Sequence, residues 1–250
     1  MRVAVVGANG SAGRRHCDAF EAEGCDVVPI DLGDCGYLDI TDVDIIAIAA
    51  PDHRHYQWLL ASQGKHIFCE KPLTHDITQL GEIERRRAIW RTFSCNLPLR
   101  HSRKLDGINL TGKVVWGQYV WGRPAKWGGW RGDIENYSII AGGGIHLVDL
   151  LMQGRGEPEG IEAVWNGRAA FARMVFGDET MFDLWVDFES EGTHRATLVT
   201  EDLIIKFDEP NDFRAPIRDF LEDVKAGRPG NGLEAIAANR VCLQIEKAAK

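Results

Sequence analysis

The sequence predicts an α/β protein with a parallel, doubly covered sheet first and an α+β domain with a mostly antiparallel open sheet second. In its first part, short runs of β-branched residues alternate with stretches of helical character. From residue 113 onward, strand-like runs follow one another with few helical stretches between them. We therefore expect one domain over residues 1–97 and a second over residues 98–250, with a C-terminal helix that packs back.

Composition narrows the class of protein. The 250 residues, 44% hydrophobic and 26% charged, suffice for an ordinary buried core. The formal net charge of −8 argues against nucleic acid as the main ligand. The six cysteines are dispersed and lack Cys-x-x-Cys spacing, so we expect reduced thiols. The first residues lack the apolar run of a signal peptide, and no segment reaches membrane-spanning length, so we expect a cytoplasmic protein.

The chain opens with a strand, a glycine-rich turn and a helix. Residues 3–6 form a β-branched run typical of a parallel strand with both faces buried. Helical character follows over residues 14–23 and ends at Gly24, a residue suited to closing a helix. Residues 25–30 predict a second strand. We expect Pro29 near its end, because proline cannot donate to the hydrogen-bond ladder.

The glycines of the turn are spaced as G-x-x-G-x-x-G. Such a turn lets the backbone approach a pyrophosphate, and the following helix offers unpaired N–H groups and a positive dipole. Asp31, directly after the second strand, can bind both ribose hydroxyls of an adenosine and would repel a 2′-phosphate. This order predicts a Rossmann-type NAD(P)-binding domain that prefers NAD over NADP. The residues expected to hold the cofactor are Gly7, Asn9, Gly10, Ser11, Ala12, Gly13 and Asp31.

The rest of the first domain continues the alternation. Only residues 32–43 separate Asp31 from the next apolar run, which is too few for a full crossover. We therefore expect a reduced second helix and a short strand near residues 37–38. The remaining predicted elements are a strand over residues 44–50, a helix over residues 56–63 closed by Gly64, and a strand over residues 65–69.

Several stretches carry a resemblance to a known family. They are residues 14–16 after the glycine turn, residues 49–55 (AAPDHRH), residues 64–73 (GKHIFCEKPL), residues 142–149 (GGGIHLVD) and the tail over residues 232–250. On these residues the chain resembles the glucose-fructose oxidoreductase, inositol dehydrogenase and rhizopine catabolism family, Gfo/Idh/MocA, as a short member. The resemblance implies oxidation or reduction of a carbinol on a sugar, cyclitol or related polyol. It also implies open sheets that pair face to face, and therefore a homodimer or homotetramer.

The resemblance also implies two catalytic residues. It places Lys71 beside the nicotinamide and His146, from the second domain, across the substrate. Hydride transfer from a carbinol requires removal of the hydroxyl proton, which a partly desolvated lysine or a histidine can perform. The simpler alternatives are a surface lysine and a buried structural histidine within the apolar stretch 145–151. The further cofactor contacts that the resemblance implies are Ala50, Pro51, His55, Glu70 and Lys71.

One position departs from the family pattern. The family often carries an aspartate four residues before the histidine, and Gly142 stands there in this chain. Asp149 matches a family position that is more often structural than catalytic. Either Lys71 and His146 work alone, or the catalytic role is weakened or changed.

In the second domain, we expect strands over residues 113–121, 163–176, 180–189, 193–200 and 202–207. Two dipeptides, Gly177-Asp178 and Glu191-Gly192, are candidate hairpin turns.

Tryptophans cluster at Trp116, Trp121, Trp127 and Trp130. We interpret Trp116 and Trp121 as packing or interface residues. Trp127, Trp130 and Arg131 could instead line a sugar, with Lys126 as a further polar contact. The substrate residues we expect are Lys71, Trp130, Arg131 and His146. We expect no metal, because His53 and His55 have no cysteine or carboxylate cluster beside them.

Three functions stay open on the sequence. The first is an NAD(P)-dependent dehydrogenase or reductase acting on sugar-like CH–OH groups. The second is NAD-dependent glycoside cleavage, in which a transient oxidation activates an elimination without net formation of NADH. The third is a dinucleotide-binding protein without catalysis, which Gly142 and the shortened first domain would suit.

Overall fold

The computed structural model describes residues 1–31, 40–101, 114–122, 138, 140–153, 155–166, 169–187, 194–200, 204–207 and 214–249. The chain forms two compact units, Met1–Pro98 with Asn211–Ile236 and Leu99–Pro210 with Ala237–Lys250. The first unit therefore takes in residues 214–236, which the sequence analysis places with the second domain. The expected short strand near residues 37–38 lies outside the described residues. None of the described helices has both the length and the hydrophobicity needed to cross a membrane.

The first unit is built on a parallel five-stranded sheet in the order β2-β1-β3-β4-β5. Four of these strands coincide with predicted ones, and the Val and Ile residues of β1 and β3 are buried on both faces of the sheet. Pro29 is the penultimate residue of β2, at the edge of the sheet, as expected. The strands are β1 (Arg2–Val6), β2 (Asp26–Ile30), β3 (Ile45–Ile48), β4 (His66–Cys69) and β5 (Thr92–Cys95).

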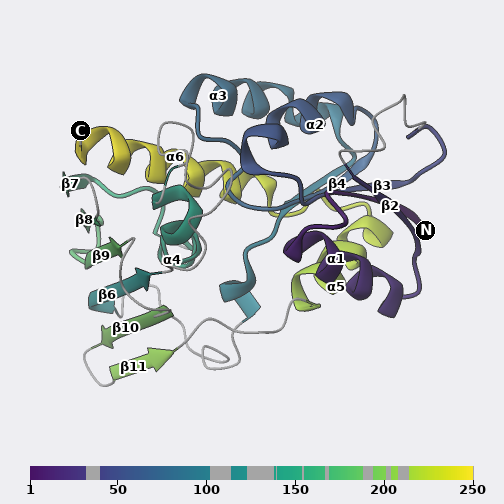
Figure 1. Cartoon of the computed structure of the whole chain (residues 1–250). Coiled ribbons are helices and arrows are strands. Elements are labelled where there is room, and N and C mark those ends of the chain that lie inside the picture. The colour runs from purple at the N-terminus through teal and green to yellow at the C-terminus, as the bar shows by residue number, and fades with distance from the viewer. Residues whose placement is uncertain are drawn as a thin grey trace. The chain divides into compact units, whose positions relative to one another are not determined.

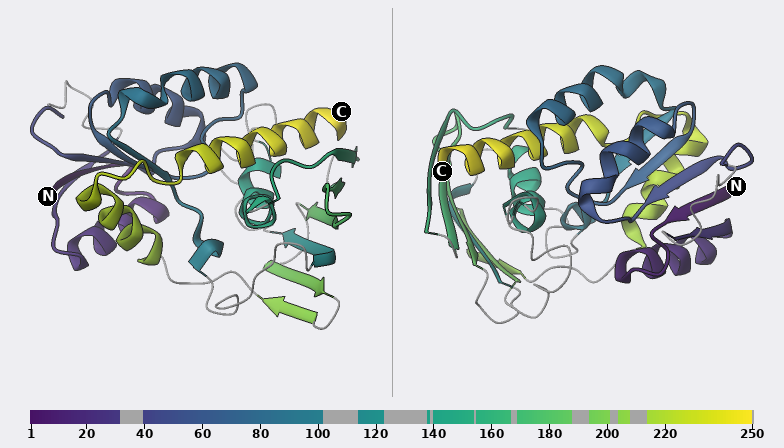
Figure 2. Two further views of the ribbon diagram at one scale, coloured as in Figure 1. Left: turned by 180° about the vertical axis from the view of Figure 1, so that it is seen from behind. Right: turned by 45° about the horizontal axis from the view of Figure 1, so that its top comes forward.

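Helices cover both faces of this sheet. In Figure 1 and in both views of Figure 2, α1 and α5 lie together on one face, and α2 and α3 lie on the other. The Asp76 carboxylate caps α3 by accepting hydrogen bonds from the N–H groups of Thr78 and Gln79, at 2.6 and 3.3 Å. The helices of this unit are α1 (Ser11–Ala22), α2 (His55–Ala61), α3 (Ile77–Arg86) and α5 (Ala215–Ala226).

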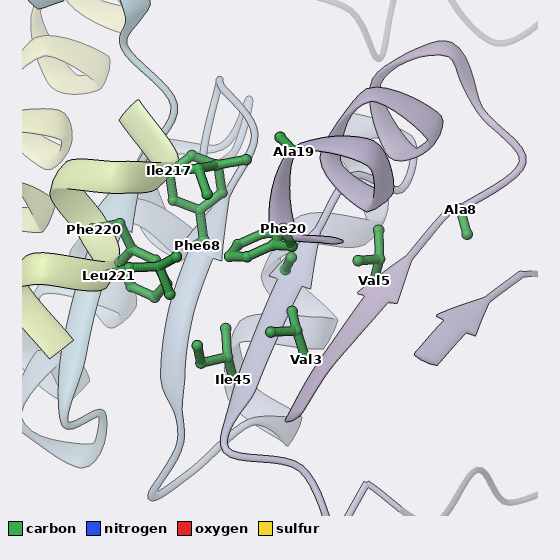
Figure 3. Packing of buried hydrophobic residues seen from close by; sticks show 11 residues of the cluster. Val3, Val5, Ala8, Ala19, Phe20, Ile45, Phe68, Ile217, Phe220 and Leu221 are labelled. Carbon is green, nitrogen blue, oxygen red and sulfur yellow. The ribbon is translucent and has the colours of Figure 1, made fainter. Parts of the chain in front are cut away.

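Three phenylalanines join α1, β4 and α5 in the core (Figure 3). The rings of Phe20 and Phe68 lie 6.0 Å apart, those of Phe68 and Phe220 5.3 Å apart, and Phe20 and Phe220 meet edge to face. Each is at most 1% exposed, and full burial of such a side chain contributes about 1.5–3 kcal/mol. This cluster explains why α5, far along the chain, belongs to the first unit.

A second contact ties the late segment to the first sheet. The hydroxyl of Thr92 donates to the Arg228 carbonyl at 2.8 Å, and the Phe93 N–H donates to the Pro229 carbonyl at 2.8 Å. The Asn231 side chain then accepts from the Cys95 N–H at 2.7 Å and donates to the Cys95 carbonyl at 3.1 Å. Residues 228–231 thus cover the outer edge of β5, where unpaired backbone groups would otherwise remain.

The second unit is built on a six-stranded sheet in the order β11-β10-β6-β9-β8-β7. All neighbouring pairs are antiparallel except β6 with β9, which run parallel. The fold class expected from the sequence is therefore confirmed. The strands are β6 (Val114–Gly122), β7 (Gly160–Trp165), β8 (Ala169–Val175), β9 (Met181–Asp187), β10 (His194–Thr200) and β11 (Ile204–Phe207).

One strand predicted for this sheet was wrong. Residues 163–176 are not one strand, since the chain turns back after Asn166 and separates β7 from β8. The Asn166 side chain accepts from the Ala169 N–H at 2.8 Å and so supports the turn, whose Asn-Gly dipeptide was the overlooked signal. The predicted turn at Glu191-Gly192 lies outside the described residues, and the strands before and after it, β9 and β10, are separated in the sheet by β6. The predicted turn at Gly177-Asp178 does join antiparallel neighbours, β8 and β9.

One face of the second sheet is covered by the segment that contains His146. A π-helical turn over Ile140–Gly144 leads into α4 (Ile145–Met152), which is buried over almost its whole length. A Cβ atom on Gly144 would lie 2.9 Å from a methyl group of Leu184 in β9, so the glycine allows close packing on the sheet. The last helix, α6 (Gly232–Ala249), begins in the first unit and continues into the second.

Candidate functional site

The glycine turn has the close packing that a dinucleotide-binding turn requires. Gly7 has φ +81°, and a Cβ atom there would lie 2.7 Å from the Ala49 carbonyl oxygen. A Cβ atom on Gly13 would lie 2.0 Å from the Gly7 oxygen, so only glycine lets α1 start this close to β1. No side chain caps the amino end of α1 at Gly10. The first-turn N–H groups, which begin at Ser11, can therefore bind an anionic group.

Asp31 is held at the mouth of this turn. Its Oδ2 atom accepts a hydrogen bond from the Asn9 N–H at 2.8 Å, although the two residues belong to different segments of the chain. The carboxylate thus stands directly beyond the carboxyl end of β2, beside the turn that follows β1. This position fits an acceptor for ribose hydroxyls, as the sequence predicts.

Glu70, directly after β4, is the centre of a buried polar network. Its Oε1 atom is 2.9 Å from Nε2 of His16 in α1 and accepts from Nδ2 of Asn96, after β5, at 2.8 Å. Burial opposes ionisation of the carboxyl group. The hydrogen bonds from His16 and Asn96 and the charge of Lys71 outweigh burial, so the pKa of Glu70 lies well below its usual range. Glu70 is therefore a carboxylate near neutral pH.

The segment that begins with Lys71 is braced by residues of the stretch that follows β3. His55 is fully buried, and its ring nitrogens lie 2.7 Å from the Pro72 carbonyl oxygen and 2.8 Å from the Ala50 carbonyl oxygen. Both polar atoms of His55 thus face the backbone, and the residue ties two loops together. A second link joins Nε2 of His75 to the Asp52 carboxylate at 3.3 Å. These braces fix the backbone that follows Lys71.

His146 is the second residue of α4 and is only 4% exposed. Its helix is held by Asp149, whose carboxylate accepts from Nε of Arg100 at 2.7 Å and from a second nitrogen of the same guanidinium. Such a two-pronged ion pair fixes both position and orientation. Gly142 lies in the π-helical turn, where its N–H donates to the Ser138 carbonyl at 2.8 Å.

The structure thus gathers Asp31, the glycine turn, Ala50–Pro51 and Glu70–Lys71 at the carboxyl ends of the first sheet. His146 belongs to the second unit. Trp127, Trp130, Arg131 and Lys126 lie outside the described residues, and Trp116 and Trp121 lie in β6.

Asn96 was missed by the sequence analysis because β5 lacks an apolar run, and His16 was noticed only through the resemblance. A usable signal existed for Asn96, since a polar residue directly after any parallel strand lies at the ligand-binding edge.

Comparisons with known proteins agree with this geometry. Residues 36–88 match the model of an oxidoreductase family with an NAD-binding Rossmann fold. A segment of 74 residues is 39% identical to inositol 2-dehydrogenase of Mycolicibacterium gilvum (strain PYR-GCK). The match covers 28% of this chain and only 20% of that relative's length.

Solved structures share the fold over the whole chain. The UDP-N-acetylglucosamine 3-dehydrogenase of Acidithiobacillus ferrooxidans has a TM-score of 0.81 at 20% identity, over 100% of this chain and 97% of its own. The WlbA dehydrogenase of Thermus thermophilus, in complex with NAD and UDP-GlcNAcA, has a TM-score of 0.77 at 19% identity, over 98% and 94%. The resemblance of this chain to the Gfo/Idh/MocA oxidoreductases is therefore confirmed over residues 36–88. The solved structures confirm the fold of both units.

Proposed function

We propose that the chain is an oxidoreductase that uses NAD in preference to NADP and acts on a carbinol or ketone of a sugar, cyclitol or related polyol. The observation that carries the proposal is the Asp31 carboxylate, tied to the glycine turn by the Asn9 N–H. A fixed carboxylate at this place suits an adenosine ribose with two unmodified hydroxyls. The names of the matched relatives, an inositol dehydrogenase and a sugar-nucleotide dehydrogenase, support the substrate class.

The chemistry divides between cofactor and protein. The nicotinamide, when bound, supplies the hydride acceptor or donor. The protein must remove the hydroxyl proton during oxidation and return it during reduction. Lys71, braced through His55 and His75, and His146, held through Asp149, are the groups we assign to this proton, and Trp130 and Arg131 stay predicted substrate contacts.

Titration with NADH and NADPH, followed by nicotinamide fluorescence, tests the cofactor site. We expect NADH to bind more tightly, and Asp31→Ala to weaken NADH by roughly tenfold, because hydrogen bonds to a charged group are lost. Asp26→Ala is the matched control, since Asp26 is an exposed carboxylate at the other end of β2. A protein that binds neither nucleotide would overturn the proposal.

Turnover on a panel of polyols and sugar nucleotides tests the chemistry. Lys71→Ala and His146→Ala should each lower kcat by about a hundredfold or more. NADH affinity should be retained in His146→Ala, whereas Lys71→Ala, at an expected cofactor contact, should weaken NADH as well. Formation of NADH in step with the oxidised product identifies a dehydrogenase. Cleavage of a glycoside without accumulation of NADH identifies the elimination mechanism instead.

Gly142 favours a second candidate, a dinucleotide-binding protein without catalysis. It places no side chain at the position where the family often carries an aspartate, in a turn that is itself buried. Tight binding of NADH together with no turnover on any of these substrates would support this candidate.

The open face of the second sheet is the surface we assign to self-association. The register lines up Val164, Phe171 and Trp185 across three strands, and Val164 and Trp185 are 64% and 40% exposed. An apolar row on an exposed sheet face is typical of an interface. Sedimentation should give a dimer or tetramer, and Trp185→Asp should shift it toward the monomer.

A further inference from the structure

Glu70 is anchored through only one of its two oxygens. Oε1 accepts from both His16 and Asn96, whereas no described residue donates to Oε2. The side chain keeps 15% of its surface exposed, although it stands among buried neighbours. The result is a carboxylate in a fixed orientation with one acceptor atom left over.

The two anchoring residues are unfavourable choices for a merely structural site. His16 is 1% exposed on the face of α1 that also buries Gly13, Ala19 and Phe20, and its ring lies 5.4 Å from that of Phe68. Its Nδ1 atom and Oδ1 of Asn96 are buried without a hydrogen-bond partner among the described residues. Each such atom costs about 1–3 kcal/mol, which an apolar side chain would avoid. Because His16 and Asn96 both bear this cost while they bind the same oxygen of Glu70, we connect the cost with the orientation of that carboxylate.

The position of Glu70 along the sheet indicates what its second oxygen meets. Asp31 follows β2, the glycine turn follows β1, and Glu70 follows β4, so three strand spacings of about 4.8 Å separate the two carboxylates, roughly 14 Å in all. A dinucleotide whose adenosine half is at Asp31 and whose pyrophosphate is at the turn extends toward β4 with its other half. This step rests on the proposed function.

We propose that His16 and Asn96 are positioning residues, which hold Glu70 in one rotamer so that Oε2 accepts hydrogen bonds from the nicotinamide half of the dinucleotide. The donors that suit this acceptor are the hydroxyls of the nicotinamide-bearing ribose. The ionised state of Glu70, whose pKa is held below its usual range, makes these hydrogen bonds charge-assisted. His16 acts from the middle of α1 and need not contact the ligand.

The competing interpretation is a staple that joins α1 to β4 and contributes only to stability. His16→Phe distinguishes the positioning role from the purely structural one, because phenylalanine can pack against Phe68 but cannot donate to Glu70. His16→Gln restores a donor at the same position. The ligands are NADH and ADP, which share the adenosine and the two phosphates, but only NADH carries the nicotinamide-bearing ribose whose hydroxyls would donate to Glu70.

The affinity of each variant for both ligands is measured by calorimetry, together with its thermal midpoint. We expect His16→Phe to weaken NADH by roughly tenfold, the loss for a hydrogen bond to a charged group, and ADP, which lacks that ribose, by less than about twofold. His16→Gln should recover most of the NADH affinity, and Asn96→Leu should repeat the His16→Phe pattern.

His66→Phe is the matched control. His66 lies in β4, the strand that Glu70 directly follows, but at the amino end of that strand and away from the site. It should leave both affinities unchanged. An unchanged NADH affinity in His16→Phe, or equal losses for NADH and ADP, would overturn the positioning role. The proposed function would still stand as long as the wild type binds NADH. A wild-type protein that binds neither ligand would overturn both.

Discussion

Two buried carboxylates, one in each unit, are used in opposite ways. Both carboxylate oxygens of Asp149 accept hydrogen bonds from the guanidinium of Arg100, and the Asp149 side chain is 2% exposed. Glu70 receives two donors on a single oxygen and leaves the other without a partner among the described residues. A carboxylate with both oxygens bound by protein fixes a helix, whereas one that is only half bound can still take a ligand. Hydrogen-bond accounting, rather than burial, distinguishes the two roles.

The largest effect should come from removing the Asp149 carboxylate, both of whose oxygens bind Arg100. Asp149→Ala leaves the Arg100 charge without its main partner, and we expect a loss of about 3–5 kcal/mol in the free energy of unfolding. Urea denaturation measures it. The double variant Arg100→Met with Asp149→Leu should regain most of this loss, because the uncompensated charge is gone. A single variant as stable as wild type would contradict a structural role for the pair.

Substitution of Glu70, the carboxylate with only one oxygen bound by protein, should affect ligand binding rather than stability. In Glu70→Gln the side-chain carbonyl can still accept from His16 and Asn96, but an amide donor replaces the second acceptor. We expect NADH affinity to fall by roughly tenfold and the free energy of unfolding to change by about 1 kcal/mol or less. A large loss of stability with unchanged NADH affinity would reverse the comparison.

The smallest effect is a change in the pH dependence of stability. The pKa of Glu70 in the folded state lies below its ordinary value of 4.5, so ionised Glu70 stabilises the fold above that pH. This contribution is lost as the pH falls below 4.5 toward the folded-state pKa. Wild type should therefore lose stability between pH 6 and 3 more steeply than Glu70→Gln, as measured by denaturant titration at each pH. Parallel curves would show that Glu70 carries no such linkage.

The sequence allowed much of the first sheet to be predicted. β1, β3 and β4 are runs of Val, Ile and Phe that must be buried on both faces, and the glycines between β1 and α1 have few other uses. Asp31 was predictable because it directly follows β2, and Glu70 was predicted through the resemblance. β5 was not, since Thr92 and Ser94 interrupt its apolar character, and Asn96 was missed with it.

Long-range partners could not be predicted in the same way. Nothing local in residues 228–231 shows that they cover β5, and nothing local in α5 assigns it to the first core rather than the second. β6 likewise pairs with β9 and β10, which are distant from it in the sequence. The tendency of consecutive strands to pair does not predict this arrangement. The single oxygen shared by His16 and Asn96 is a matter of three-dimensional geometry alone.

The covering of the β5 edge by residues 228–231 has a consequence for folding during synthesis. During synthesis from the amino end, β1 to β5 leave the ribosome long before α5 and Asn231, which close their edge and cover Phe20 and Phe68. Until then the nascent sheet exposes an unpaired strand and an aromatic surface, the features that recruit chaperones or promote aggregation. A fragment ending at Pro98 should therefore be poorly behaved, and co-expression with residues 211–250 should rescue its solubility.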